Sequence, residues 1–149
     1  MRFVIQRVTR ASVTVDNKTV AQIGSGFLVL AGVFGSDTEA EADKMVKKLC
    51  GLRIFADENG KTNKSLADVG GELLMVSQFT LCADCRHGNR PSFTDAGPAD
   101  HAEALFNYIC ERAQQSVPSV KRGIFGADMK VELLNDGPVT ICMDTKNKE

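Results

Sequence analysis

The 149-residue sequence has no tryptophan, one tyrosine and only two histidines, His87 and His101. Two histidines exclude a histidine-rich metal site and any catalytic scheme that needs several imidazoles. Eighteen basic residues against nineteen acidic residues leave a formal net charge of −1. This balance argues against a uniformly basic nucleic-acid-binding protein, although it leaves room for a local basic patch.

Long hydrophobic runs are also missing. The longest apolar stretch, residues 26–34, is too short to span a membrane and has the composition of a strand. The N-terminal segment is interrupted by Gln6, Arg7 and Arg10, so it lacks the apolar core of a signal peptide. Five cysteines, an odd number, indicate free thiols rather than a disulfide framework. We therefore expect a cytoplasmic protein that does not act at a membrane.

The length predicts one domain that spans residues 1–149, because a chain of this size can bury roughly 68–70% of its unfolded surface. β-Branched and aromatic runs predict most of the secondary structure as strands. They lie near residues 2–8, 11–15, 18–23, 27–33, 52–55, 73–76, 130–134 and 139–143.

Two helices complete the expected fold. An S-x-x-E capping box at Ser36 and Glu39 opens the first, and Gly51 ends it. The second begins at Gly97-Pro98, with the proline in its first turn, and Pro118 stops it. Many strands and two helices predict an α+β single domain with a mixed or antiparallel sheet, or a barrel-like core.

The loop over residues 82–98 is long, and long loops in compact domains are often functional. It contains a Cys-x-x-Cys pair, Cys82 and Cys85, followed by His87. With His101 these residues could supply four zinc ligands only at irregular spacing, and no thioredoxin-like pattern surrounds the pair. We expect no metal and no cofactor; a zinc or redox protein remains the alternative. We also expect His101 to be a solvated residue in the first turn of its helix.

Two other segments point to a site. In residues 77–81, polar side chains interrupt the end of an apolar strand. Burying polar groups there costs free energy unless they form hydrogen bonds. In residues 135–140, a Gly-Pro pair is expected to form a tight turn between two strands. Taken singly, each segment is also compatible with an ordinary strand end or hairpin turn.

Together the two segments resemble the signatures of the D-aminoacyl-tRNA deacylase family, and the resemblance covers essentially the whole chain. The first segment matches S-Q-F-T-L and the second matches N-x-G-P-x-T. Residues 6–8, 11–13 and 90–93 match further parts of the family pattern. The cysteine pair departs from that pattern.

The resemblance implies an enzyme that hydrolyses the ester bond of D-aminoacyl-tRNA, and of mischarged glycyl-tRNA, as a proofreading step in translation. It further implies a homodimer with active sites at the interface, in which a cis Gly137-Pro138 pair of one subunit reaches the partner's pocket. Its backbone would exclude the side chain of an L-amino acid, so that specificity comes from rejection.

The site residues that follow from the resemblance form two groups. The catalytic group is Ser77, Gln78, Phe79 and Thr80. The substrate-binding and chiral-selection group is Leu81, Asn135, Gly137, Pro138, Val139 and Thr140.

For the chemistry, we expect main-chain amides of Phe79 and Thr80 to stabilise the oxyanion. The resemblance implies that the 2′-hydroxyl of the terminal ribose assists. A covalent mechanism with Thr80 as nucleophile is the alternative, although no base is visible nearby. A binding module without turnover is a further alternative. Phosphate contacts could come from lysines and arginines at 44, 47, 48, 86, 90, 121, 122 and 130.

Overall fold

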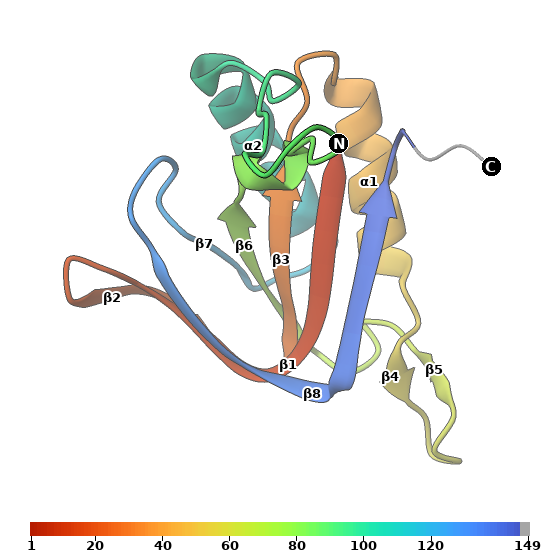
Figure 1. Ribbon diagram of the computed structural model, residues 1–149. Helices are drawn as coiled ribbons and strands as arrows, with labels where there is room; N and C mark the ends of the chain where they lie inside the picture. Colours follow the sequence, from red (N-terminus) through yellow and green to blue (C-terminus); the bar gives the residue numbers. More distant parts are fainter. Residues whose placement is uncertain (147–149) are drawn as a thin grey trace.

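The computed structural model describes residues 1–146, and its organising element is β1 (Arg2–Val15). One edge of this strand pairs antiparallel with β2 (Lys18–Ile23) and β3 (Gly26–Gly32), and the other edge pairs antiparallel with β8 (Lys130–Asp144). A parallel ladder then joins β3 to β6 (Glu72–Ser77) and β6 to β7 (Val120–Arg122). The result is a strongly curved six-stranded mixed sheet (Figure 1). The predicted fold class, with its mixed sheet and two main helices, is confirmed.

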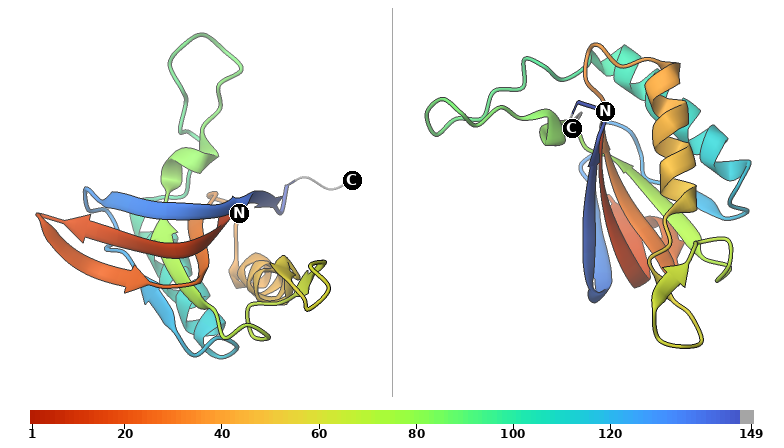
Figure 2. Two further views of the ribbon diagram at one scale, coloured as in Figure 1. Left: turned by 90° about the horizontal axis from the view of Figure 1, so that it is seen from below. Right: turned by 90° about the vertical axis from the view of Figure 1, so that its right-hand side faces the viewer.

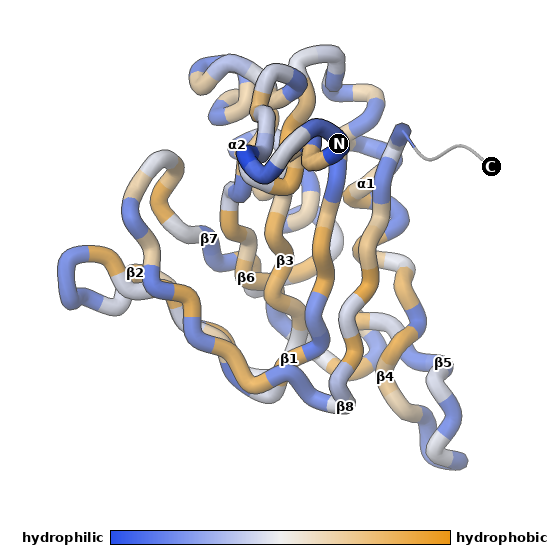
Figure 3. Tube along the Cα trace, in the orientation of Figure 1, coloured by the Kyte–Doolittle hydropathy of each residue, from blue (hydrophilic) through white to orange (hydrophobic). Residues whose placement is uncertain are grey.

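Both helices, α1 (Glu39–Gly51) and α2 (Ala99–Gln114), cover the same face of the sheet (Figure 2). The larger apolar core lies between them and the strands, and includes Phe3, Phe27 and Phe106. A smaller core lies on the opposite face, within the curl formed by β1 and β2, so apolar residues line most of the strands (Figure 3). Within residues 1–146, no helix is long and apolar enough to cross a membrane.

The predicted capping box of α1 is wrong by two residues. Thr38, not Ser36, is the N-cap: its hydroxyl accepts from the Ala40 amide, and its own amide donates to Glu41 over 2.7 Å. The reason lies in the preceding turn, where the buried carboxylate of Asp37 accepts from the Phe34 amide. That bond holds residues 34–37 in a turn and delays the helix to the T-x-x-E pattern. The second helix also begins later than predicted: α2 starts at Ala99, and Pro98 is its N-cap rather than a residue of its first turn.

The strand expected at residues 52–55 is also shorter than predicted. Only Phe55–Ala56 forms a strand, β4, which pairs with β5 (Thr62–Lys64), an element that the sequence did not reveal. The Ile54 carbonyl accepts a hydrogen bond from the Arg7 guanidinium rather than from a neighbouring strand. β7 was likewise not predicted.

The two C-terminal strands, expected to form a hairpin, are one continuous strand. Residues 130–135 of β8 pair with residues 14–8 of β1, and residues 140–144 continue along the same strand to Arg2. The chain therefore does not reverse direction at Gly137-Pro138. The two strands predicted at residues 2–8 and 11–15 are likewise one strand, β1, and both parts of it pair with β8.

Candidate active site

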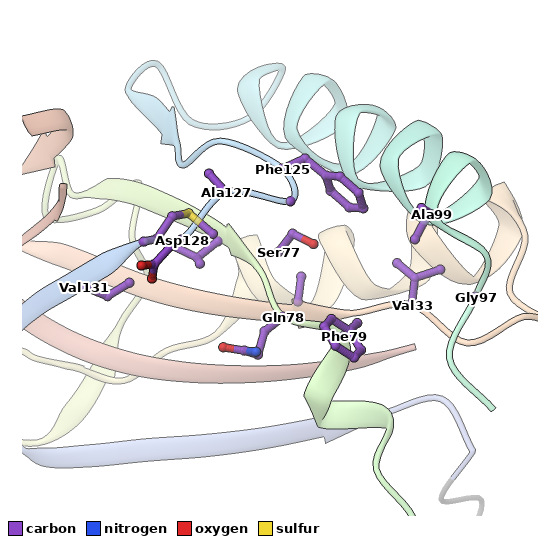
Figure 4. Close-up of a pocket in the computed structure, with 15 residues that line it drawn as sticks. Val33, Ser77, Gln78, Phe79, Gly97, Ala99, Phe125, Ala127, Asp128 and Val131 are labelled. Carbon is purple, nitrogen blue, oxygen red and sulfur yellow. The ribbon is translucent and has the colours of Figure 1, made fainter. Parts of the chain in front are cut away.

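A cavity of about 550 Å³ opens where β3 and β6 end against the start of α2 (Figure 4). Its walls are mostly apolar, and Asp128 is the one ionisable residue among them. They consist of Ala31, Val33, Val76, Ser77, Gln78, Phe79, Gly97, Ala99, Ala102, Phe125, Gly126, Ala127, Asp128, Met129 and Val131. The cavity thus includes three of the four residues that the sequence placed in the catalytic group.

Two polar residues of the cavity, Ser77 and Gln78, lie at the end of β6. The Gln78 amide donates to the Ala31 carbonyl over 2.8 Å, which extends the β3–β6 ladder by one residue. The chain then turns into a single 3₁₀ turn, η1 (Phe79–Cys82), over the end of β3. A Cβ atom on Gly32 would lie 2.9 Å from the Leu81 Cβ, so this close packing requires glycine at position 32. The structure places Leu81 behind the cavity rather than in its lining.

η1 presents two main-chain donors next to the cavity. Phe79 and Thr80 are its first two residues, so their amides have no acceptor inside the turn. The Thr80 hydroxyl accepts a hydrogen bond from the Gln78 side-chain amide over 2.5 Å. Because an amide cannot take a proton from a hydroxyl, this partner does not activate Thr80 as a nucleophile.

The long loop returns to the same place. Asp84 and Ser92 exchange two backbone hydrogen bonds, of 2.8 and 2.9 Å, which bring the two arms of the loop together. Phe93 then contacts Phe79 edge to face, with ring centroids 5.2 Å apart. At this closure, hydrogen bonds from Arg86 lower the pKa of the Asp84 carboxyl to about 2. The matching segment at residues 90–93 is thereby placed beside the S-Q-F-T-L segment.

η1 is also held from below by Arg2. Its guanidinium donates to the Leu81 carbonyl over 2.7 Å and pairs with the Asp144 carboxylate at 2.6 Å. The same group lies 5.5 Å from the centroid of the Phe34 ring. These contacts connect the first residues of β1 and the last residues of β8 to the site.

The far wall, residues 125–129, was missed by the sequence analysis. It belongs to the connection between β7 and β8, where the Gly123 amide donates to the Met75 carbonyl and Phe125 packs against Phe106. A signal was present in the apolar residues Ile124 and Phe125, which lie between two glycines, Gly123 and Gly126. No periodicity accompanies this signal, because the segment is irregular.

Apart from Leu81 in η1, the second predicted group lies elsewhere on the chain. Gln6 pairs with Thr140 and Val8 with Asn135, so Arg7 alone faces the four residues 136–139, which leave the ladder as a bulge. The Gly137–Pro138 peptide bond is cis, as the resemblance implies. Arg7 lies four residues from Phe3 along β1, and Phe3 pairs with Ala31, which lines the cavity. The bulge is therefore about 13 Å from the cavity within one chain.

Side-chain hydrogen bonds hold the bulge together. The Asn135 amide group accepts from the Val139 amide over 2.9 Å and donates to the Thr140 hydroxyl over 3.0 Å. The Arg7 guanidinium donates to the Asp136 carbonyl over 3.0 Å. Gly137 has a φ of 137°, and a Cβ there would lie 2.8 Å from the Val139 side chain, so the turn requires glycine.

The cysteines and histidines do not assemble into a metal site. No group of three or more histidine, cysteine, aspartate or glutamate side chains that could hold an ion occurs within residues 1–146. Cys82 is buried and its pKa is raised by burial, whereas a redox-active thiol needs a lowered one. The expectation that His101 is solvated is wrong: its Nε2 atom is buried without a hydrogen-bond partner, beside Gly97.

Comparison with known proteins agrees with this geometry. The family model described as D-Tyr-tRNA(Tyr) deacylase matches residues 4–144. Two curated relatives named D-aminoacyl-tRNA deacylase are similar over nearly their full length. The Phocaeicola vulgatus protein is 54% identical, with 100% of both chains covered, and the Azoarcus protein is 57% identical, with 95% of this chain and 93% of the relative covered.

A solved structure described as c-Myc DNA Unwinding Element Binding Protein has the same fold, with a TM-score of 0.93 and 44% identity over 97% of this chain and 99% of that one. The family match spans both signature segments and almost every strand of the sheet. The chain therefore belongs to the D-Tyr-tRNA(Tyr) deacylase family.

Proposed function

We propose that this protein hydrolyses the ester bond between a D-amino acid and the terminal adenosine of tRNA, in the cytoplasm. The observation that carries the proposal is the cavity at the end of β6. It combines main-chain donors with a ligand-sized space, and its lining residues lie within the residues 4–144 that match the family model. A volume of about 550 Å³ falls in the range of small-ligand sites. It suits the aminoacylated end of the RNA.

The chemistry would depend on the backbone. An ester carbonyl placed against η1 would direct its developing oxyanion toward the amides of Phe79 and Thr80. Gln78 would bind substrate or position the attacking water, and Ser77 would contact the adenosine. Because Thr80 is bonded to an amide and has no base, we favour assistance from the substrate's 2′-hydroxyl over a covalent threonyl ester.

Chiral selection would require a second copy of the chain. The bulge at Gly137-Pro138 cannot reach the cavity of its own chain, from which it is about 13 Å away along β1. Within the described residues, β8 pairs only with β1, so the outer edge of this fifteen-residue strand has no strand partner, and Leu134 on the strand is 51% exposed. Such an edge is a template for pairing with another chain.

We therefore infer a homodimer in which Gly137-Pro138 of one subunit faces residues 77–81 of the other. Asn135, Val139 and Thr140 would hold the turn, and Leu81 would support η1. Placed at the ester, the turn backbone would clash with the side chain of an L-amino acid. A D-amino acid or glycine would fit, so mischarged glycyl-tRNA would also be a substrate.

The deciding experiment compares the hydrolysis of one tRNA species charged with a D-amino acid, with the corresponding L-amino acid or with glycine. Each reaction is run with and without a chelator. We expect free D-amino acid and glycine to be released, L-aminoacyl-tRNA to persist and the chelator to have no effect. Stable retention of D-aminoacyl-tRNA without release would contradict the proposal and favour a binding module. Sedimentation equilibrium gives the mass independently, and a monomer at the assay concentration would overturn the proposed interface.

A further inference from the structure

A second hollow, of about 500 Å³, lies along the last turns of α1, away from the active-site cavity. Its lining contains four cationic residues and no acidic one: Lys44, Lys47, Lys48, Gly51, Leu52 and Arg53. We call these residues the α1 basic groove. Lys44, Lys47 and Lys48 are exposed and lie on one side of the helix at spacings of three and four residues.

The lysines of this groove are not neutralised by the protein. Lys44, Lys47 and Lys48 form no ion pair within residues 1–146, whereas Arg2, Arg10, Arg86 and Arg112 each have a carboxylate partner. The acidic residues of α1 lie toward its start, and Asp43 among them is bonded to Tyr108 and Arg112. Arg53 is fixed by a hydrogen bond to the Asn63 carbonyl over 2.9 Å. Four cationic side chains that have no carboxylate partner within residues 1–146 thus line one hollow of a protein whose net charge is near zero.

The α1 basic groove is adjacent to the Gly137-Pro138 bulge. Arg53 ends the groove, and the carbonyl of the next residue, Ile54, accepts a 2.5 Å hydrogen bond from Arg7. The same guanidinium donates to the Asp136 carbonyl inside the bulge. Figure 1 shows the C-terminal end of α1 and the middle of β8 on the same lower part of the molecule. One arginine therefore connects the groove to the turn.

We propose that the α1 basic groove binds the phosphate backbone of the tRNA substrate, and this inference rests on the proposed function. In the proposed dimer, Arg7 would keep the groove beside the Gly137-Pro138 turn of its own subunit, so the groove would lie near the partner's cavity. RNA that leaves that cavity would then pass along the groove. Lysine and arginine side chains without carboxylate partners are the groups that neutralise phosphates and release counterions.

The test replaces Lys44, Lys47 and Lys48 together by glutamine, which keeps helix propensity and removes three charges. Hydrolysis is measured on D-tyrosyl-tRNA and on D-tyrosyl-adenosine, which has the ester but no RNA stem. We expect the ratio of kcat/KM for the tRNA to that for the adenosine ester to fall about tenfold. The slope of log Kd for uncharged tRNA against log salt should become shallower by about 2 to 3.

A matched control replaces Lys18, Lys61 and Lys146 by glutamine, three exposed lysines outside the groove that give the same change in net charge, spread over β2, the β4–β5 turn and the residues after β8. The ratio and the salt slope should stay at their wild-type values in this control. An equal effect in both triple variants, or none in the groove variant, would overturn the inference. Failure of the wild-type protein to hydrolyse either D-tyrosyl substrate would instead reject the proposed function.

Discussion

The two signature segments both interrupt a strand, but they do so in opposite ways. Residues 77–81 end β6 and turn over the edge of the sheet, where η1 packs on Gly32 and is bonded to Arg2. Residues 135–140 leave the ladder and rejoin it, because Asn135 and Thr140 stay in register with β1. The first segment borders a cavity of its own chain, and the second is not part of the lining of that cavity. One half of the proposed site is thus complete in a single chain, while the other half requires a partner.

This difference separates two properties that are often linked. Catalysis, in our proposal, depends on the first segment and its cavity, whereas rejection of L-amino acids depends on the second. Substitutions near one segment should change one property and spare the other. The following variants test this separation, from the largest expected effect to the smallest.

Filling the cavity should have the largest effect. Ala127 lines the cavity from the β7–β8 connection and is partly exposed, so tryptophan there can occupy the space without entering the core. We expect Ala127→Trp to lower kcat/KM for D-aminoacyl-tRNA about a hundredfold. Ala67→Trp, at an exposed position outside the cavity, is the matched control and should retain activity. Full activity of the Ala127 variant would place the substrate elsewhere.

Changing the turn should alter selectivity more than rate. Pro138→Ala frees the backbone of the bulge, so we expect the ratio of D- to L-aminoacyl-tRNA hydrolysis to fall about tenfold. Kinetics on matched substrates measure this ratio, and Pro118→Ala, in the connection after α2, serves as the control. A proportional loss on both substrates would show that the turn contributes to catalysis and would break the separation.

The support of the first segment should depend on pH. Glu72 opens β6, and its carboxylate accepts from the Ser119 hydroxyl over 2.6 Å and from the Gly24 amide over 2.9 Å. These bonds, the Ser119 hydroxyl first, hold its pKa below the ordinary value of 4.5. A lowered folded-state pKa gives stability above pH 4.5 that is lost as the pH falls through the folded value.

We therefore expect Glu72→Gln to lower the free energy of unfolding by about 1 kcal/mol at pH 7. The difference from wild type should shrink below pH 4.5, as measured by urea denaturation at several pH values. Glu103→Gln, at an exposed site on α2, is the matched control for removal of a carboxylate. A difference that is constant with pH would mean that the carboxylate charge is not what stabilises β6.

The smallest effect should come from Thr80. Its hydroxyl is bonded to the Gln78 amide, so we expect Thr80→Ala to keep kcat within about fivefold of wild type, a loss below 1 kcal/mol. Single-turnover assays provide the measurement. Loss of turnover in a folded Thr80→Ala, together with activity in Thr80→Ser, would restore the covalent mechanism.

The sequence predicted the regular elements well because their signals are local. The buried run of β3, the hairpin to β2 and the apolar stripe of α2 all follow from periodicity. It failed where long-range contacts decide the outcome. Gly137-Pro138 looks like a hairpin turn, but continuous pairing with β1 makes it a bulge. Thr38 rather than Ser36 caps the helix because the buried Asp37 holds the preceding turn.

The site itself was predictable only in part. The polar end of β6 was visible as an interruption of an apolar run, and the resemblance named both segments. Residues 125–129 carry no periodic signal, and long-range contacts hold them at the cavity: the Gly123 amide is bonded to the Met75 carbonyl of the neighbouring strand, and Phe125 packs against Phe106. Likewise, the proximity of the α1 basic groove to the bulge depends on one arginine that joins Ile54 and Asp136.

The bulge has a consequence for how the protein can change. Four residues of β8 stand opposite one of β1, while the pairs on either side keep their partners. The number and kind of residues between Asn135 and Thr140 are thus independent of strand register, and a longer or shorter turn would leave the cross-strand pairs in place. Selectivity can then be redesigned by inserting or deleting residues there, as in an exchangeable loop, without redesigning the sheet that carries it.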